Sequence, residues 1–240
     1  TLAAIRDLVA EVETEAGGTG PVGVGIPGAI SPTTGLVKNA NSTWLIGKPL
    51  HLDLEAVLGR EVRVANDANC FALSEAVDGA AAGRSVVFGV ILGTGVGGGI
   101  AVNGRVLTGP NAIAGEWGHN PMPWPEPDEW PGPPCWCGKT GCIETLLSGP
   151  AFERDGRDPE RHADRLARAL AMVLNLLDPD VIVLGGGLSN LDLLYEAVPA
   201  RWGRWAFSDR IATPLLPPRW GDSSGVRGAA WLWEGRRIGN

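Results

Sequence analysis

Three closely spaced cysteines and an upstream histidine constrain the fold of this chain more than any other feature of its sequence. The segment Cys135-Trp-Cys137-Gly-Lys-Thr-Gly-Cys142 follows His119, and the glycines within it allow the backbone to turn tightly. Three thiolates and one imidazole form a ligand set that a tetrahedral structural zinc takes. The spacing therefore predicts a zinc site made of these four residues. Such a site would hold together the Pro- and Trp-rich loop 121–136.

A disulfide with one spare thiol is the alternative interpretation of the same cysteines. The chain has four cysteines, and its first residues show no signal-peptide pattern. Disulfides accumulate in secreted proteins, whereas clustered cysteines in cytosolic proteins more often bind metal. We therefore expect a cytoplasmic protein in which zinc, and not a disulfide, organises the loop.

Composition and charge narrow the classes of partner. The 240 residues are 44% hydrophobic and 20% charged, which suffices for one large or two modest domains. A net charge of -7, with no run of Lys or Arg, argues against nucleic acid or an anionic membrane surface. No apolar run approaches the roughly 20 residues that span a bilayer. We expect small-molecule ligands, with neither nucleic acid nor membrane as a partner.

Apolar runs of strand length alternate with helical patterns along the chain. Short clusters of the 35 glycines and 19 prolines lie between them and mark turns. This alternation predicts an α/β architecture with a polar loop over residues 29–50. Helices are expected over residues 2–16, 52–58, 68–77, 160–177, 191–197 and 226–233, and strands over 22–26, 61–65, 86–92 and 181–184.

The segment Gly93–Gly99 matches the spacing of a dinucleotide-binding fingerprint, but its context differs. That fingerprint needs a helix directly after the glycines, whereas the pair Asn103-Gly104 predicts a β-hairpin. A turn with bare backbone amides and the Thr94 hydroxyl can instead cradle phosphate oxygens, with a merely flexible turn as the alternative. A second glycine turn, Gly185–Gly187, lies between a strand and a helix, where backbone can pack against a planar base.

Carboxylates at a strand end and beside the cysteine loop are candidate site residues. Asp67, next to Asn66, can accept a proton from a substrate hydroxyl, while its structural alternative is to cap the helix that follows. Glu116 and Glu144 flank the loop and are by default solvated surface charges. If the loop folds around a metal, both carboxylates become fixed in one place, where they can hold substrate hydroxyls.

Four motifs in this order resemble the ROK family of bacterial sugar kinases and sugar-responsive repressors. They are Ala65-Asn-Asp-Ala-Asn69, Leu92-Gly-Thr-Gly-Val-Gly-Gly-Gly99, Gly115-Glu-Trp-Gly-His119 and Cys135-Trp-Cys-Gly-Lys-Thr-Gly-Cys-Ile-Glu144. The resemblance extends over essentially the whole chain. It implies the two-lobed actin-like ATPase (ribonuclease H-like) α/β fold, with a zinc-bound loop and a homodimeric assembly.

The resemblance also implies a division into lobes. Residues 1–66 with about 223–240 would form the smaller lobe, and 67–222 the larger lobe with the zinc loop and the nucleotide-contacting turns. The family begins with a strand and a Gly-rich Asp-x-Gly-Gly-Thr type segment that grips the ATP phosphates, and nothing like it precedes Thr1. We therefore expect the N-terminal phosphate-binding strands to be missing from this sequence, which reads as part of a longer chain.

Roles for individual residues follow from the resemblance. Asp67 would be the general base, and ATP and Mg²⁺ would be bound together with a structural Zn²⁺. The sugar would contact Gly28, Asn41, Asn66, Glu116, His119 and Glu144, with His119 also a zinc ligand beside Cys135, Cys137 and Cys142. Gly93, Thr94 and Gly95 would bind the ATP phosphates, and Gly185, Gly186 and Gly187 would line the adenosine.

Three segments look most like the fructokinase branch of the family. They are Lys38–Leu45, Gly115–Pro121 and Gly221–Trp231. The expected reaction is therefore ATP-dependent phosphorylation of a hexose, with fructose giving fructose 6-phosphate and with mannose or glucose as other acceptors. The N-acetylglucosamine kinase branch is the next alternative. A non-enzymatic sugar-sensing regulator of the same family and a truncated sugar-binding module are the others, although the presence of Asp67 favours a kinase.

Overall fold

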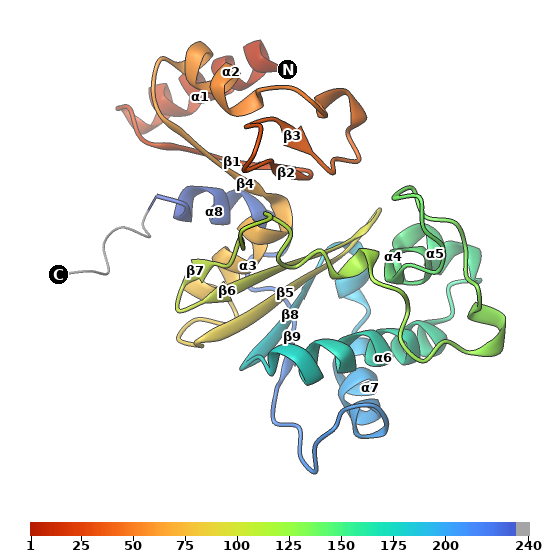
Figure 1. Ribbon diagram of the computed structural model, residues 1–240. Coiled ribbons are helices and arrows are strands. Elements are labelled where there is room, and N and C mark those ends of the chain that lie inside the picture. The colour runs from red at the N-terminus through yellow and green to blue at the C-terminus, as the bar shows by residue number, and fades with distance from the viewer. Residues whose placement is uncertain (234–240) are drawn as a thin grey trace.

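The smaller, N-terminal part of the chain is built on two short sheets. A computed structural model describes residues 1–233, so the predicted lobe segment 234–240 lies outside the described residues. The strands β1 (Val22–Ile26) and β4 (Val62–Asn66) pair in parallel, and β2 (Ala29–Ile30) and β3 (Val37–Lys38) form an antiparallel hairpin. Helices α1 (Leu2–Ala16) and α2 (Leu50–Leu58) pack together above them (Figure 1).

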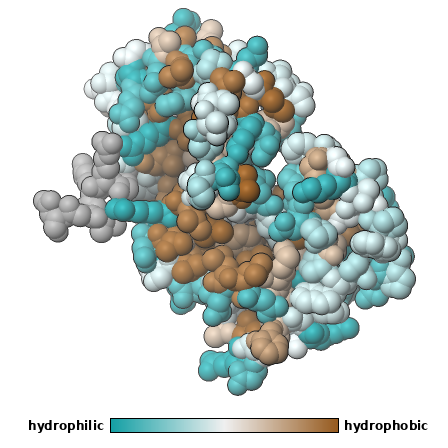
Figure 2. Space-filling model, viewed as in Figure 1, coloured by the Kyte–Doolittle hydropathy of each residue, from teal (hydrophilic) through white to brown (hydrophobic). Residues whose placement is uncertain are grey.

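A five-stranded sheet forms the centre of the larger part. Its order is β7-β6-β5-β8-β9, with antiparallel pairing of β7, β6 and β5 and parallel pairing of β5, β8 and β9. The strand bounds are β5 (Val86–Leu92), β6 (Val96–Val102), β7 (Arg105–Val106), β8 (Val181–Gly185) and β9 (Leu215–Leu216). Figure 2 shows hydrophobic residues gathered over this sheet in the middle of the face presented.

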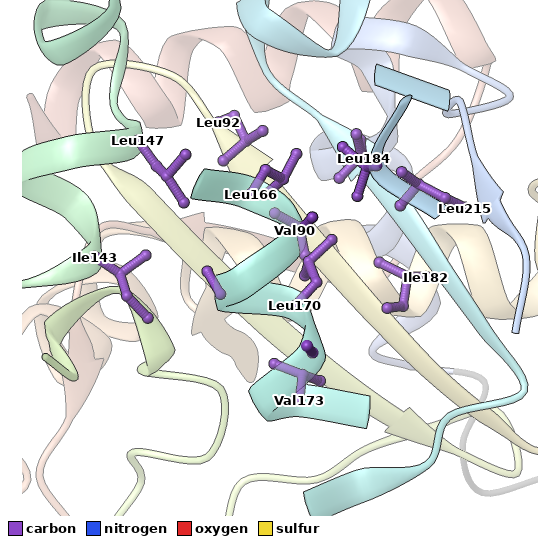
Figure 3. Close-up of a cluster of buried hydrophobic side chains, with 14 of the residues drawn as sticks. Val90, Leu92, Ile143, Leu147, Leu166, Leu170, Val173, Ile182, Leu184 and Leu215 are labelled. Atoms are coloured by element: carbon purple, nitrogen blue, oxygen red, sulfur yellow. The ribbon is translucent and has the colours of Figure 1, made fainter. Parts of the chain in front are cut away.

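Side chains of β5 and β8 alternate between two helix layers, because successive residues of a strand point to opposite faces. One set packs in a cluster with Phe71 of α3 (Asp67–Val77), and the other packs against α6 (Pro159–Leu177). Figure 3 shows Leu166 and Leu170 of α6 among this second set. The first set is Val87, Val181 and Val183, and the second is Phe88, Val90, Leu92, Ile182 and Leu184.

Helix α8 (Ser224–Trp231) joins the two parts of the molecule. It packs against α3 and β1, and two of these approaches leave no room for a side chain. A Cβ on Gly228 would lie 1.6 Å from the Cys70 carbonyl oxygen, and a Cβ on Gly23 would lie 1.9 Å from the Ala229 carbonyl oxygen. Glycine at both positions therefore lets α8 seat directly on the backbone of β1 and α3.

Most predicted elements are present, with boundaries shifted by a few residues. The hairpin at Asn103-Gly104 is confirmed, since both residues have the positive φ angles, 50° and 70°, of a tight hairpin turn. The expected glycine loop is shorter than predicted, because β6 begins at Val96 and only Gly93–Gly95 form the turn.

The prediction of a loop over 29–50 is wrong in part, since β2 and β3 pair there. Helices α4 (Ile143–Leu147), α5 (Gly149–Arg154) and α7 (Leu193–Arg201) complete the larger part, the first two unforeseen.

Among the described helices, none combines the length and apolar character needed to cross a membrane. The lobe boundary at residue 66 and the phosphate-binding strands expected ahead of Thr1 stay predictions.

A buried carboxylate anchors the loop 121–136 to α6. Glu129 is 3% exposed and accepts hydrogen bonds from Arg165 (2.7 Å) and Arg168 (2.7 and 3.0 Å), which are equally buried. Burial by itself raises the pKa of Glu129, but the hydrogen bonds from Arg168 and Arg165 outweigh it and hold the pKa at about 2. Arg168 also donates to the Trp124 carbonyl oxygen at 2.8 Å, so the loop is ordered by this ion cluster as well as by its cysteines.

We expect Glu129→Gln to lower the free energy of unfolding by about 3–5 kcal/mol, because it removes the buried carboxylate that Arg165 and Arg168 share and leaves each with only a more exposed partner, Asp155 or Asp164. Urea denaturation followed by circular dichroism measures the change. The matched control is Asp128→Asn, which breaks the surface pair of Asp128 with Arg161 (2.6 Å) on the same loop and helix. It should cost less than about 1 kcal/mol. Equal effects of the two substitutions would contradict the assignment.

Candidate functional site

A cavity of about 410 Å³ lies where the strand ends of the smaller part face the larger sheet. Parallel β1 and β4 end together at this edge, and α3, the β5–β6 turn and α4 reach it from the larger part. We call it the main cavity. All residues predicted to hold substrate or phosphate line it: Gly28, Asn41, Asn66, Asp67, Gly93, Thr94, Gly95, Glu116, His119 and Glu144.

Asn66, and not Asp67, is the residue that caps α3. The Asn66 Oδ1 accepts from the backbone N–H groups of Ala68 (2.9 Å) and Asn69 (3.3 Å). Its Nδ2 donates to the Gly28 carbonyl oxygen at 3.1 Å, which ties β4 to the turn after β1. The capping role that was the structural alternative for Asp67 therefore belongs to Asn66. Because most of the Asn66 amide is engaged in the fold, its role toward substrate stays a prediction.

Asp67 begins α3 inside the main cavity. Its Oδ1 accepts a hydrogen bond from the Ala68 N–H at 2.8 Å. Burial raises the pKa of Asp67, and hydrogen bonds from backbone N–H groups oppose the rise only in part. A carboxylate with a raised pKa, fixed at a helix start in a cavity, has the properties of a general base.

Glu116 and Glu144 give the main cavity a strong anionic character. Burial raises the pKa of Glu116, His119 opposes this, and the charges of Asp67 and Glu144 raise the pKa further. Glu144 is held by two donors, the Val96 N–H at 3.0 Å and the Trp136 indole at 2.7 Å. A cavity lined by several carboxylates suits a neutral ligand rich in hydroxyl donors.

Trp136 is a cavity residue that the sequence did not single out. It lies between two of the clustered cysteines, donates to Glu144, and packs edge-on against His119 with ring centroids 4.9 Å apart. It is 55% exposed, so its ring forms an outer wall of the main cavity. Its position in the Cys-Trp-Cys motif is the signal that would have indicated it.

The predicted metal ligands come together in the structure. One ligand atom from each of His119, Cys135, Cys137 and Cys142 lies within 4.8 Å of the others. The Cys137 and Cys142 sulfurs are 3.6 Å apart, as are the Cys135 sulfur and His119 Nδ1. Tetrahedral zinc with sulfur ligands at about 2.3 Å requires ligand separations of about 3.8 Å, so the residues fit that ion. None of the four cysteines of the chain, all of which lie among the described residues, forms a disulfide. Cys70 is the one outside this cluster, and it is buried in α3.

The β5–β6 turn lies between the main cavity and a more open one. Gly93 and Thr94 line both, and the outer cavity, of about 520 Å³, is completed by residues that include Gly149, Pro150 and Gly187. Thr94 is exposed at the tip of the turn, and the Gly149 N–H donates to the Gly93 carbonyl oxygen at 2.7 Å. An exposed turn of this kind, with a hollow on each side, can present backbone N–H groups to phosphate oxygens.

Two members of the second glycine turn serve packing in this structure. A Cβ on Gly185 would lie 2.6 Å from the Phe71 ring, and one on Gly186 would lie 2.5 Å from the Leu92 carbonyl oxygen. Only Gly187 of the triplet lines the outer cavity. Of the three glycines predicted to line the adenosine, Gly187 therefore lies beside a cavity. The other two allow neighbouring strand and helix residues to pack closely.

Comparisons with known proteins agree with the motifs. The family model "ROK family" matches residues 1–165 and 157–236. N-acetyl-D-glucosamine kinase of Yersinia pseudotuberculosis serotype O:1b (strain IP 31758) is 41% identical over 257 residues, covering 95% of this chain and 84% of the relative. That of Pectobacterium atrosepticum is also 41% identical, over 260 residues, covering 96% of this chain and 86% of the relative.

Solved structures show the same fold. The ROK hexokinase of Thermus thermophilus superposes with a TM-score of 0.81 at 32% identity, covering 96% of this chain and 84% of the other. The ROK family glucokinase of Streptomyces griseus, in complex with glucose and AMPPNP, gives 0.77 at 26% identity, covering 97% and 88%. The predicted α/β fold of the ROK kinases is thereby confirmed, and the chain belongs to the ROK family.

Proposed function

We propose that the protein is a sugar kinase that transfers the terminal phosphoryl group of ATP to a hydroxyl of N-acetyl-D-glucosamine. The 41% identical relatives are N-acetyl-D-glucosamine kinases, and the structural neighbours include a hexokinase and a glucokinase. The enzyme class is the one that the motifs predicted. The relatives favour N-acetyl-D-glucosamine, the alternative acceptor, over the fructose expected from the motifs, and we adopt it.

The observation that carries the proposal is the placement of Asp67. It lies in the cavity that also contains Glu116 and Glu144, and the turn with Thr94 opens from that cavity toward the outer one. A sugar held by the carboxylates would present a hydroxyl to Asp67, and a nucleotide in the outer cavity would direct its phosphates at the turn. Phosphoryl transfer depends on such positioning and on charge neutralisation more than on covalent chemistry.

Each side chain then has a defined task. Asp67 accepts the proton of the attacking hydroxyl, while Glu116, Glu144 and His119 orient the ring by accepting or donating hydrogen bonds. Backbone N–H groups of Gly93–Gly95 bind phosphate, and the hollow beside Gly187 receives the adenosine. Mg²⁺, which enters with ATP, neutralises charge on the transferred group.

Zinc at the cysteine cluster would have a structural role. With His119 Nδ1 directed at the Cys135 sulfur, the ring's other nitrogen is left for the main cavity. Cys142 immediately precedes α4, which carries Glu144. A metal bound here would therefore fix two sugar-binding groups at once, without taking part in the chemical step.

The test is a coupled ADP-release assay with Mg·ATP and a panel of N-acetyl-D-glucosamine, glucose, mannose and fructose. We expect the highest kcat/KM with N-acetyl-D-glucosamine, by about tenfold or more over the others. A highest value with fructose would overturn the choice of sugar. Absence of turnover in a folded, zinc-loaded protein that still binds sugar would overturn the kinase proposal and favour the regulator or the truncated sugar-binding module. The homodimer stays a prediction, which sedimentation of the same sample would examine.

A further inference from the structure

A second, smaller cavity of about 160 Å³ adjoins the main cavity, and Asn66 and Glu116 line both. We call it the side cavity. It lies between the ends of β1, β2 and β4 on one side and the loop 107–116 on the other. Its remaining lining residues are Ile26, Ala29, Ile30, Val64, Ala65, Asn69, Thr108, Ala112 and Ala114.

The side cavity is lined by apolar side chains and by almost as large an area of polar groups. One of these is Asn69, which is only 9% exposed, and its Oδ1 is buried with no hydrogen-bond partner among the described residues. Buried polar atoms are nearly always paired, so this orphan acceptor would gain a partner if the Asn69 amide turned toward a ligand donor in the cavity. The Thr108 hydroxyl, on the facing loop, can donate as well as accept.

The wall opposite the strands is fixed in place before any ligand binds. Lys38 at the end of β3 donates to the Asn111 carbonyl oxygen at 2.6 Å, which ties the loop 107–116 to the smaller part of the molecule. Within the loop, the Ala114 N–H donates to the Thr108 carbonyl oxygen. A preformed hollow selects a substituent of matching shape, because no binding energy is spent on ordering it.

We propose that the side cavity is an acyl subsite, which receives the acetamido group of an N-acetylated amino sugar whose ring lies in the main cavity. An acetamido group offers one N–H donor, one carbonyl acceptor and one methyl group. The Asn69 amide turns toward the cavity so that its Oδ1 accepts from the N–H, the Thr108 hydroxyl donates to the carbonyl, and the methyl packs against Ala112, Ala114 and Ile30. The inference rests on the proposed function and extends it, because it names the groups that choose the sugar.

Discrimination against unsubstituted hexoses follows from the same contacts. Glucose carries a hydroxyl where the N-acetylated sugar carries the acetamido group, and a hydroxyl is too short to fill the side cavity. When glucose binds, the Asn69 acceptor stays unpaired and the apolar wall of the side cavity stays in contact with water. Sites that are built to pair a ligand's polar group reject analogues that lack it far more strongly than sites that measure size alone.

The experiment compares two variants of the full-length protein with N-acetyl-D-glucosamine and glucose. Asn69→Leu removes the acceptor at similar size, and Ala114→Leu fills the cavity from the loop. We expect each to lower kcat/KM for N-acetyl-D-glucosamine by about 10- to 100-fold while changing that for glucose by less than about threefold. The matched control is Ile113→Ala, an exposed neighbour that does not line the cavity and should change neither.

Calorimetric binding of each sugar without ATP separates the subsite from the chemical step. If a folded variant loses both sugars equally, or neither, the subsite assignment is overturned while the kinase proposal stands. If the wild-type protein binds and phosphorylates glucose but not N-acetyl-D-glucosamine, the choice of sugar fails and the subsite fails with it. Circular dichroism establishes that each variant is folded, and Ala114→Leu carries the test should Asn69→Leu fail to fold.

Discussion

Asp67→Asn lowers kcat for sugar phosphorylation by about 10²- to 10⁴-fold while the KM for sugar changes little. The amide keeps the shape of the side chain and its hydrogen bond from the Ala68 N–H, at 2.8 Å in the wild-type structure, but it cannot accept the proton of the attacking hydroxyl. Initial rates with Mg·ATP and N-acetyl-D-glucosamine measure the loss. A variant that keeps more than about a tenth of the wild-type kcat would contradict the assignment of Asp67 as general base.

The pH dependence of the same pair of proteins gives a second readout. Burial raises the pKa of Asp67, so the carboxylate is protonated, and the enzyme inactive, up to a higher pH than for an ordinary aspartate. Wild-type kcat/KM should therefore rise with pH through this pKa, and the residual activity of the variant should lack that limb. An unchanged acid limb in the variant would assign it to another group, such as the buried Glu116.

Stability provides the control for these measurements. A carboxyl whose folded pKa is raised favours folding most below its unfolded pKa, and this contribution is lost as the pH rises through the folded pKa. At neutral pH the ionised Asp67 is thus a cost to the fold, which the neutral amide removes. We expect Asp67→Asn to be at least as stable as the wild-type protein, so its loss of activity cannot be assigned to unfolding.

Glu116→Gln is the companion variant, for which the KM for sugar should rise more than kcat falls.

The sequence predicted the parts of the site that depend on local order along the chain. Asn66 and Asp67 follow a strand, and the turn at Gly93–Gly95 follows another, so their place at a sheet edge is a consequence of strand direction. The spacing of the three cysteines predicts a common site with His119, and the structure brings one ligand atom of each of the four residues within 4.8 Å of the others. Even here the structure changes details, because Asn66 takes the helix cap that was expected of Asp67.

Residues whose role depends on distant partners were beyond prediction. From the sequence, Glu129 is expected to be a surface charge. Its burial depends on two arginines of α6, which lie far away along the chain. Gly185 and Gly186 have the same appearance in sequence whether they face a nucleotide or a neighbouring side chain, and the structure places them against Phe71 and Leu92. The side cavity is lined by three separate stretches of chain, so no single motif in the sequence indicates it.

The loop 121–142 is held at two places. Substitutions at one place should mainly change the stability of the protein, and substitutions at the other should mainly change its activity. At one end Glu129 is buried against α6, and at the other the cluster of His119 and the cysteines faces the main cavity. Glu129→Gln should therefore reduce stability while the protein keeps its zinc. Loss of zinc should affect function most, because it releases the segment that holds His119 and the cysteines beside the main cavity.

Cys142→Ser should remove most of the zinc and lower kcat/KM by about 100-fold or more, since zinc ligands position catalytic side chains and weaker disturbances around a metal already cost about 10- to 100-fold. Cys142 is 1% exposed and directly precedes the helix that carries Glu144, so release of the metal frees this carboxylate and His119 together. Zinc content by mass spectrometry and the ADP-release assay measure the two effects, and Cys70→Ala, outside the cluster, should keep its zinc. A wild-type protein that purifies without zinc, or a variant that keeps both metal and activity, would show that the cluster has another role. Zinc loss with activity preserved would show that the sugar site does not need the metal, because His119 and Glu144 would then hold their positions unaided.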